Sequence, residues 1–296
     1  VLSEKEIFGK LSRFEFPEEE QRIYAADQRI NDYGILADLE LAHAAQDMDE
    51  EYKARLTEKA EKDFGLSSLK SMPQLKGFIK ERTGLVINSL DKNNIEGVIK
   101  TITSLKNVTE EDKQAVLDVI DLRREIGKTS NAKYTAMLAS AGRGNRIRGL
   151  FRYYGASRTG RWAGRLVQLQ NLPQNHIEDL DGARDLAKMH DLDMMEVIYD
   201  KPTHILSQLI RTTFIAPEGY TFSVADFSAI EARVIAWLSG EAWRLKVFNS
   251  HGKIYEASAS KMFNIPIELV TKGSDWRAKG KVAELALGYQ GAIGAL

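Results

Sequence analysis

Charged and apolar residues recur at helical spacing through the first 140 residues of the chain. This pattern predicts helices over residues 18–31, 38–63, 72–83, 95–105 and 109–138. Thr109 is followed by three acidic residues, which is typical of a helix start, because its hydroxyl can accept a backbone hydrogen bond and acids favour the positive end of the helix dipole. Asp38 and Glu40 allow two interpretations, a metal-binding exonuclease pair or acids that open a helix, and the dipole favours the second.

After Gly142 the pattern is mixed. Helices are predicted over residues 183–191, 203–210 and 230–239, and strands over 147–154, 212–216 and 220–225. Pro217 and Gly219 lie between the last two strands and indicate a turn. The fold class that we expect is α+β, with helices predominating.

The composition excludes several classes of protein. The chain has 296 residues, a net charge of -1 and no cysteine, which excludes disulfides, thiolate metal sites and a cysteine nucleophile. No apolar run approaches the roughly 20 residues of a membrane helix, and no signal peptide opens the chain. We therefore expect a cytosolic protein of two or more domains that has no membrane partner.

The net charge of the whole chain is close to zero, but one stretch of it is strongly basic. Eleven lysines and arginines lie between residues 122 and 170, where Glu125 is the single acid and aromatic residues are interleaved. This composition is typical of a surface that contacts the phosphate backbone of nucleic acid. The alternative is a solvated basic face, although such faces usually mix charges of both signs.

Asp226 stands where the predicted strand 220–225 gives way to a helix. A carboxylate held at the end of a strand is well placed to bind a divalent cation. The alternative is structural, because Ser228 and Glu231 have the spacing of a capping box and would then simply start the helix.

The last helix carries Arg277, Lys281, Leu285 and Tyr289 at intervals of four residues. Four residues turn a helix by about 400°, so these side chains share one broad face. Two cations one turn apart can hold a triphosphate and neutralise the charge of its leaving group. An exposed basic first turn on an amphipathic helix is the alternative.

Taken together, these motifs resemble those of the family A DNA polymerases, the group of bacterial DNA polymerase I. Residues 226–233 resemble motif A, and the last helix, with its Arg-x-x-x-Lys pattern and tyrosine, resembles motif B. Residues 159–161 and 169–173 resemble the palm segment that meets the primer-template. The amino-acid sequences of residues 160–165 and 236–241 are similar to those of phage or prophage members of the family.

The resemblance implies a right-hand architecture of thumb, palm and fingers. It implies the end of an exonuclease-like region with connecting helices over 1–62, a helical thumb over 63–141, a palm with motif A over 142–240, and fingers with motif B over 241–296. The implied activity is that of a DNA-directed DNA polymerase, a nucleotidyltransferase that joins a dNTP to a primer 3′-hydroxyl by a two-metal mechanism. The implied partners are primer-template DNA and dNTPs.

The resemblance also implies roles for single residues. Asp226 would bind both Mg²⁺ ions, with the backbone carbonyl of Phe227 at the nucleotide-side ion. Glu231, partnered by Tyr289, would crowd a ribose 2′-hydroxyl and so select deoxynucleotides. The implied DNA-binding residues are Arg161, Arg165, Gln168, Gln170, Asn171 and Lys128, of which Arg161, Gln168 and Gln170 would reach the minor groove, where all correct base pairs share acceptors.

At motif B, the resemblance implies that Arg277 and Lys281 hold the triphosphate and that Lys281 protonates the pyrophosphate leaving group. The chain departs from its relatives at two positions here. Leu285 stands where many relatives stack Phe or Tyr on the incoming base. Tyr255 stands where bacterial relatives have a histidine that contacts phosphate.

A larger departure is that no motif C, with its second metal-binding Asp, is found in the sequence. We therefore expect a truncated N-terminal portion of a polymerase, with an incomplete Mg²⁺ ligand set and a complementary C-terminal segment elsewhere, in the cytoplasm of a bacterial cell or phage-infected host. Two alternatives stay open: a non-catalytic nucleic-acid-binding remnant or split-polymerase half, and a relative of single-subunit RNA polymerases, against which Glu231 argues.

Overall fold

In the computed structural model, a 26-residue helix, α3 (Leu39–Phe64), carries much of the core of the N-terminal part of the chain. It begins at Asp38, whose carboxylate accepts a hydrogen bond from the backbone N–H of Leu41 at 3.1 Å. Asp38 therefore caps a helix, as the interpretation based on the helix dipole predicts. The side chains of Leu41, Ala45 and Met48 are buried along one face of α3.

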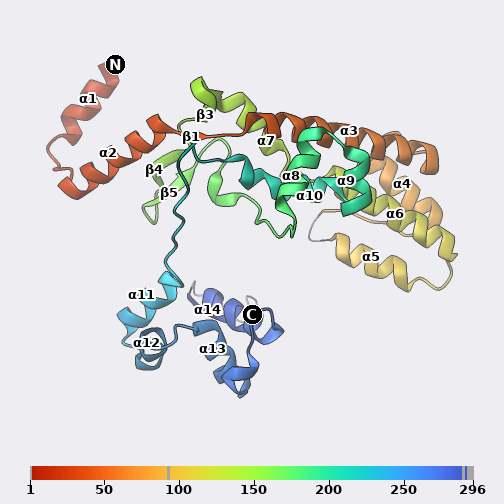
Figure 1. Ribbon diagram of the computed structural model, residues 1–296. Coiled ribbons are helices and arrows are strands. Elements are labelled where there is room, and N and C mark those ends of the chain that lie inside the picture. The colour runs from red at the N-terminus through yellow and green to blue at the C-terminus, as the bar shows by residue number, and fades with distance from the viewer. Residues whose placement is uncertain (1, 92–93, 289–290, 292–296) are drawn as a thin grey trace. The chain divides into compact units, whose positions relative to one another are not determined.

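The structure describes residues 2–91, 94–288 and 291 (Figure 1). The chain divides into two compact units, unit 1 over residues 1–221 and unit 2 over residues 222–296, and each is described by itself. Helices predominate in both, and the strands are short. The predicted α+β class is confirmed, whereas the boundaries at 62, 141 and 240 stay predictions.

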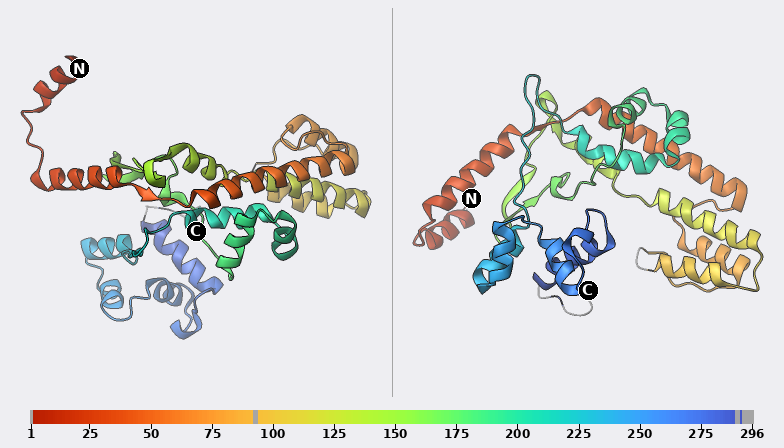
Figure 2. Two further views of the ribbon diagram at one scale, coloured as in Figure 1. Left: turned by 45° about the horizontal axis from the view of Figure 1, so that its top comes forward. Right: turned by 60° about the horizontal axis from the view of Figure 1, so that its bottom comes forward.

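Unit 1 is largely helical. Besides α3, its described helices are α1 (Leu2–Leu11), α2 (Glu18–Tyr33), α4 (Met72–Thr83), α5 (Ile95–Ser104), α6 (Glu110–Ile126), α7 (Ala132–Ser140), α8 (Leu180–Met189), α9 (Leu192–Tyr199) and α10 (Pro202–Leu209), with 3-10 turns η1 (Arg143–Asn145), η2 (Leu169–Asn171) and η3 (Ile210–Thr213). Helix α6 packs against both α3 and α4 (Figures 1 and 2). Thr109 caps α6, because its hydroxyl accepts from the N–H of Asp112. The single helix predicted over 109–138 is two helices, since α6 ends before Gly127.

The strands of unit 1 are β1 (Ile35–Leu36), β2 (Ala141–Gly142), β3 (Arg146–Ile147), β4 (Phe151–Ala156) and β5 (Arg161–Gly164). Strand β3 lies between β1 and β2, and Ile147 pairs with both Ile35 and Ala141. Strands β4 and β5 form an antiparallel pair with a register shift. The strand predicted over 147–154 is interrupted at Gly149, whose φ of 68° does not continue a strand.

Helices α8 and α9 dock on α3 through ion pairs. Arg184 and Lys188 of α8 each lie 2.9 Å from the Asp38 carboxylate, and Glu196 of α9 lies 3.0 Å from Arg55 of α3. Burial alone would raise the pKa of Asp38, but the hydrogen bond from Leu41 and the two cations outweigh it and lower that pKa.

The strand predicted over 220–225 is wrong. This segment has neither helix nor strand, and the side chains of Tyr220, Phe222 and Val224 are exposed. In the preceding segment, Phe214 forms an isolated antiparallel bridge with Ala37. The alternating pattern is that of a strand, but a strand forms only where a neighbour pairs with its N–H and C=O groups.

Unit 2 is helical throughout its regular elements, which are α11 (Ile230–Ser239), α12 (Ala242–Asn249), α13 (Ile254–Phe263), the 3-10 turn η4 (Ile267–Leu269) and α14 (Asp275–Gly288). Helix α11 has the predicted bounds. Helices α13 and α14 pack against each other (Figure 1). Within the described ranges of both units, no helix has the length and apolar character needed to cross a membrane.

Candidate functional site

Asp226 lies in the exposed, irregular segment before α11, and not at the end of a strand. The capping-box alternative requires Ser228 at the N-cap of α11, whereas the structure places Ala229 there with a left-handed φ of 49°. The carbonyl of Ser228 instead accepts a hydrogen bond from Nε of Arg233 at 2.8 Å. This bond ties the segment that carries Asp226 to the first turn of α11, where Glu231 is half-buried.

The predicted shared face of the last helix is present on α14. Arg277 is half-buried, while Lys281 and Leu285 are exposed, so this face is open to a ligand. Tyr289 lies outside the described residues. Arg277 and Lys281 are separated by four residues, a rise of about 6 Å along the helix.

The neighbouring face of α14 is fixed against α13. Gly280 packs so closely that a Cβ there would overlap the carbonyl oxygen of Tyr255 and lie 3.0 Å from the Cβ of Ala259. One turn further on, the buried carboxylate of Glu284 accepts a hydrogen bond from the hydroxyl of Ser258 on α13. The cations of α14 are therefore presented by a helix whose inner face has a defined register against its neighbour.

Glu284 also connects a third helix to this pair. Its Oε1 lies 2.8 Å from a terminal nitrogen of Arg244 on α12. Burial alone would lower the pKa of Arg244, but the hydrogen bond to Glu284 and the nearby acids Glu284 and Glu241 raise it. Helices α12, α13 and α14 thus meet at one buried carboxylate.

Arg277 is held by two side chains of α13. Its Nε donates to Oε1 of Glu256 at 2.6 Å, and its guanidinium lies 5.5 Å from the centre of the Tyr255 ring. Glu256 is largely buried, with 13% of its side chain exposed. Sequence reasoning missed Glu256, because its partner follows 21 residues later on another helix.

The two motif-bearing helices lie together inside unit 2. Helix α11 packs against α14, and a Cβ at Gly288 would lie 3.3 Å from Cδ1 of Ile235. The structure therefore brings the helix that follows Asp226 next to the helix of Arg277 and Lys281. This is the arrangement that a site built from both motifs requires.

Asp226 by itself does not make a metal centre. Over the part of the chain that the structure describes, no group of three or more His, Asp or Glu side chains is placed to hold an ion. Asp226 and the adjacent carbonyl of Phe227 could supply oxygen ligands, but Mg²⁺ favours six. The described residues therefore do not fit a complete Mg²⁺ site.

The predicted DNA-binding residues gather in unit 1 around β5 and η2. Arg161 and Arg165, together with Gln168, Gln170 and Asn171, are all exposed. Gln168 has a left-handed φ of 56°, and the side chain of Gln170 packs on Gly164, where a Cβ would overlap it. Exposed polar side chains on a backbone with strained geometry are typical of a binding surface.

The loop between β5 and η2, and the residue that follows η2, are each held by a cation. Lys133 of α7 donates to the carbonyl of Val167 at 2.6 Å, and Arg211 donates to the carbonyl of Leu172 at 2.8 Å. Burial lowers the pKa of Lys133. These two cations of the chain serve to position the loop.

The β4–β5 hairpin is anchored on α2. Tyr153 donates a hydrogen bond to the carboxylate of Glu20, which raises the pKa of Tyr153 to about 12. Nε1 of Trp162 donates to the buried carboxylate of Asp27 at 2.7 Å. The aromatic residues that sequence analysis assigned to a nucleic-acid surface thus serve in part to fix the hairpin.

Several cations of the basic stretch are engaged within unit 1. Lys128 pairs with the buried Glu125 at 3.1 Å, and Arg124 lies 3.3 Å from Glu96. Backbone carbonyls accept hydrogen bonds from Arg123, Lys133, Arg146 and Arg148. The basic surface offered to a ligand is therefore narrower than the sequence predicts, and Lys128 is turned to an internal partner.

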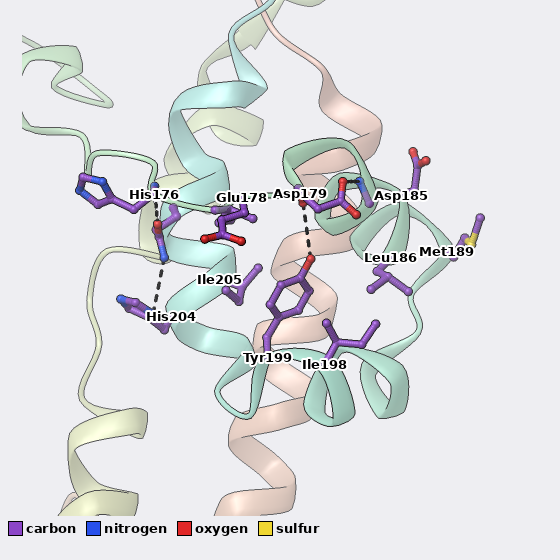
Figure 3. A pocket seen from close by; sticks show the side chains of 13 residues that line it. His176, Glu178, Asp179, Asp185, Leu186, Met189, Ile198, Tyr199, His204 and Ile205 are labelled. Carbon is purple, nitrogen blue, oxygen red and sulfur yellow. Dashed lines mark hydrogen bonds between the residues drawn. The ribbon is translucent and has the colours of Figure 1, made fainter.

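A separate cavity of about 790 Å³ lies in unit 1 between the chain before α8, helices α8 and α9, and α10 (Figure 3). Its described lining residues include Glu178, Asp179 and Asp185 but no lysine or arginine. The hydroxyl of Tyr199 lies 3.5 Å from the carbonyl of Asp179 across it. An acidic lining disfavours phosphate, so we do not expect DNA to bind in this cavity.

Similar proteins are found among the polymerases. A family model described as DNA polymerase family A matches residues 39–292. The chain is 54% identical over all its 296 residues to a DNA polymerase of Bacillus phage SP02, of which it covers 44%. It is 45% identical over 65 residues to a thermostable DNA polymerase I of Thermus aquaticus, which is 22% of this chain and 8% of that protein.

A solved structure shares the fold. It is the POL domain of Pol1 from M. smegmatis in complex with DNA primer-template and dNTP, with a TM-score of 0.57 and 23% identity. The likeness covers 87% of this chain and 40% of the other. The chain thus spans less than half the length of both the phage relative and this structure.

Proposed function

Because this chain belongs to DNA polymerase family A, we propose that the complete protein is a DNA-directed DNA polymerase whose incoming dNTP binds to unit 2. The observation that carries the proposal is the open face of α14, with Arg277 and Lys281 one turn apart, beside the helix that follows Asp226. Two cations at this spacing suit an extended polyanion such as a triphosphate.

In the proposed reaction the primer 3′-hydroxyl gives its proton to solvent water, and its oxygen attacks the α-phosphorus of the dNTP. The new O3′–P bond forms as the bond to the bridging oxygen of the β-phosphate breaks, and pyrophosphate leaves. Arg277 and Lys281 hold the triphosphate, and Lys281 gives a proton to the leaving oxygen. Leu285 packs against the incoming base, and Glu231, with Tyr289 as its expected partner, crowds the position of a 2′-hydroxyl.

Mg²⁺ would supply Lewis-acid stabilisation of the charge on the phosphates. Asp226 and the carbonyl of Phe227 would be its ligands in this chain. The other carboxylate is proposed to come from a segment outside residues 1–296, which the phage relative, more than twice as long, has room to supply.

The proposed primer-template surface is the exposed set around β5 and η2, with Arg161 and Arg165 on phosphate and Gln168 and Gln170 at the minor groove. Support comes from their shared exposure and from the loop anchors Lys133 and Arg211. Template and nucleotides would be met in the cytoplasm of a bacterial or phage-infected cell.

The test is primer extension by the complete gene product with a defined template, dNTPs and Mg²⁺. Asp226→Asn keeps the size of the side chain and removes its charge, so we expect extension to fall by roughly a thousandfold or more, on the scale of losing a main electrostatic contributor. Asp275→Asn, an exposed acid at the start of α14, is the matched control. Unchanged extension by Asp226→Asn would remove Asp226 from the proposed site, and a wild-type protein that binds DNA but extends no primer would favour a non-catalytic binding protein.

A further inference from the structure

A second cavity, of about 620 Å³, lies in unit 2 next to the first turn of α14. Its walls come from the turn before α13, from α13 itself, from the segment that contains η4, and from Arg277. The basic side chains that line it are His251, Lys253, Lys272 and Arg277. Arg277 therefore borders both this cavity and the cationic face of α14.

The charge of this cavity favours an anion. Two carboxylates also line it, Glu256 and Glu268, but Glu256 is already paired with Arg277 at 2.6 Å. Lys253 and Lys272 are exposed, so their ammonium groups are open to a ligand that enters the cavity. Against them stands Glu268 alone among the described lining residues.

His251 is oriented by a hydrogen bond to the backbone. Its Nδ1 accepts from the N–H of Lys253 at 3.0 Å. The proton of the ring is therefore on Nε2, which can donate it to a phosphate oxygen.

Glu256 fixes the orientation of the arginine. It binds Nε of Arg277, while the four N–H groups on the terminal nitrogens are the ones that form a fork around a phosphate. A guanidinium held at Nε and stacked near Tyr255 is preorganised, because less side-chain entropy is lost when a phosphate binds.

We propose that this cavity binds the terminal phosphate of the incoming dNTP. Lys253, Lys272 and His251 contact that phosphate together with Arg277. The proposal rests on the proposed function, in which the triphosphate lies along α14 from Lys281 to Arg277. A polyphosphate that follows these cations toward the start of the helix ends at the mouth of the cavity. The site distinguishes a triphosphate from a diphosphate, which ends before reaching it.

The test compares dATP with dADP on the complete gene product, bound to a template and a dideoxy-terminated primer so that no chemistry follows. Calorimetry with Mg²⁺ gives the two dissociation constants. For the double variant Lys253→Gln/Lys272→Gln we expect dATP to bind roughly tenfold more weakly, which is about 1.4 kcal/mol. Binding of dADP should change less than twofold, so that the preference for triphosphate largely disappears.

The double variant Lys246→Gln/Lys261→Gln is the control, because it removes the same two positive charges from exposed positions on α12 and α13 in the same unit. Thermal unfolding of each variant checks that unit 2 stays folded. Equal weakening of dATP and dADP, or unchanged dATP binding in the double variant, overturns the terminal-phosphate site. A wild-type protein that binds neither nucleotide contradicts the proposed function itself, and with it this site.

Discussion

The α-carbon of Gly280 on α14 lies against the backbone carbonyl oxygen of Tyr255 on α13, with no room for a methyl group between them. Two helices approach this closely only where one of them lacks a side chain. The contact sets the register in which α14 presents Arg277 and Lys281 to its open face.

Gly280→Ala is therefore expected to destabilise unit 2, by about 1–3 kcal/mol, because the helices must separate to admit the methyl group. Calorimetric unfolding measures the effect. Gly77→Ala is the matched control, since Gly77 lies inside α4 and a Cβ added there would meet nothing within 4 Å. It should stabilise the protein by roughly 0.5–1 kcal/mol. Equal effects of the two substitutions would contradict the close contact.

Arg161→Ala and Arg165→Ala should each weaken binding of primer-template DNA. If each arginine contacts one phosphate, the slope of log affinity against log salt becomes shallower by about 1 for each residue removed. Fluorescence anisotropy over a salt series measures both quantities. Lys59→Ala, on the exposed side of α3, should leave the slope as it is. An unchanged slope in both arginine variants would place the phosphate contacts elsewhere.

Glu231→Ala should relax the choice of sugar. Removing the carboxylate side chain from the first turn of α11 leaves space for a ribose 2′-hydroxyl, so the preference for dNTP over rNTP is expected to fall roughly tenfold, or about 1.4 kcal/mol. Single-nucleotide insertion kinetics with dATP and ATP give the ratio. Glu218→Ala, in an exposed turn, serves as the control, and an unaltered ratio at position 231 would exclude the steric role.

Asp38→Asn should destabilise unit 1 by roughly 1–3 kcal/mol at neutral pH, because it removes a carboxylate bonded to Arg184 and Lys188 while asparagine can still cap α3. The pKa of Asp38 is lowered in the folded state. Its contribution is therefore present above the unfolded pKa of about 4 and is lost as the pH falls through the lower folded value. Urea unfolding from pH 7 to pH 3 should show the two proteins converging at acid pH.

Sequence patterns located the helices well because their signals are local. Thr109 and the three acids after it predict the start of α6. Helix α11 has the bounds that its apolar spacing predicts. Helices α9, α12 and α13 were not predicted. For α9 a local signal was available in Asp191, which caps it by accepting from the N–H of Met194.

The features that sequence reasoning missed depend on distant partners. The strand predicted over 220–225 needs a neighbouring strand, which no local pattern can guarantee. The pair of Glu256 with Arg277 joins two helices, and Lys133 reaches a carbonyl 34 residues away. The roles that the motifs predict for Asp226, Arg277 and Lys281 stay predictions. The structure shows that α11, the helix after Asp226, packs against α14.

The buried carboxylate of Glu284 has a consequence for how this region can evolve. Losing Glu284 leaves Arg244 paired with Glu241 alone, whereas losing Arg244 leaves the buried carboxylate of Glu284 without its cation, at a cost of about 3–5 kcal/mol. Ser258 is bound to the same oxygen. Single substitutions at these three positions therefore lead through poorly folded intermediates, and lineages that change one of them are expected to change the others with it.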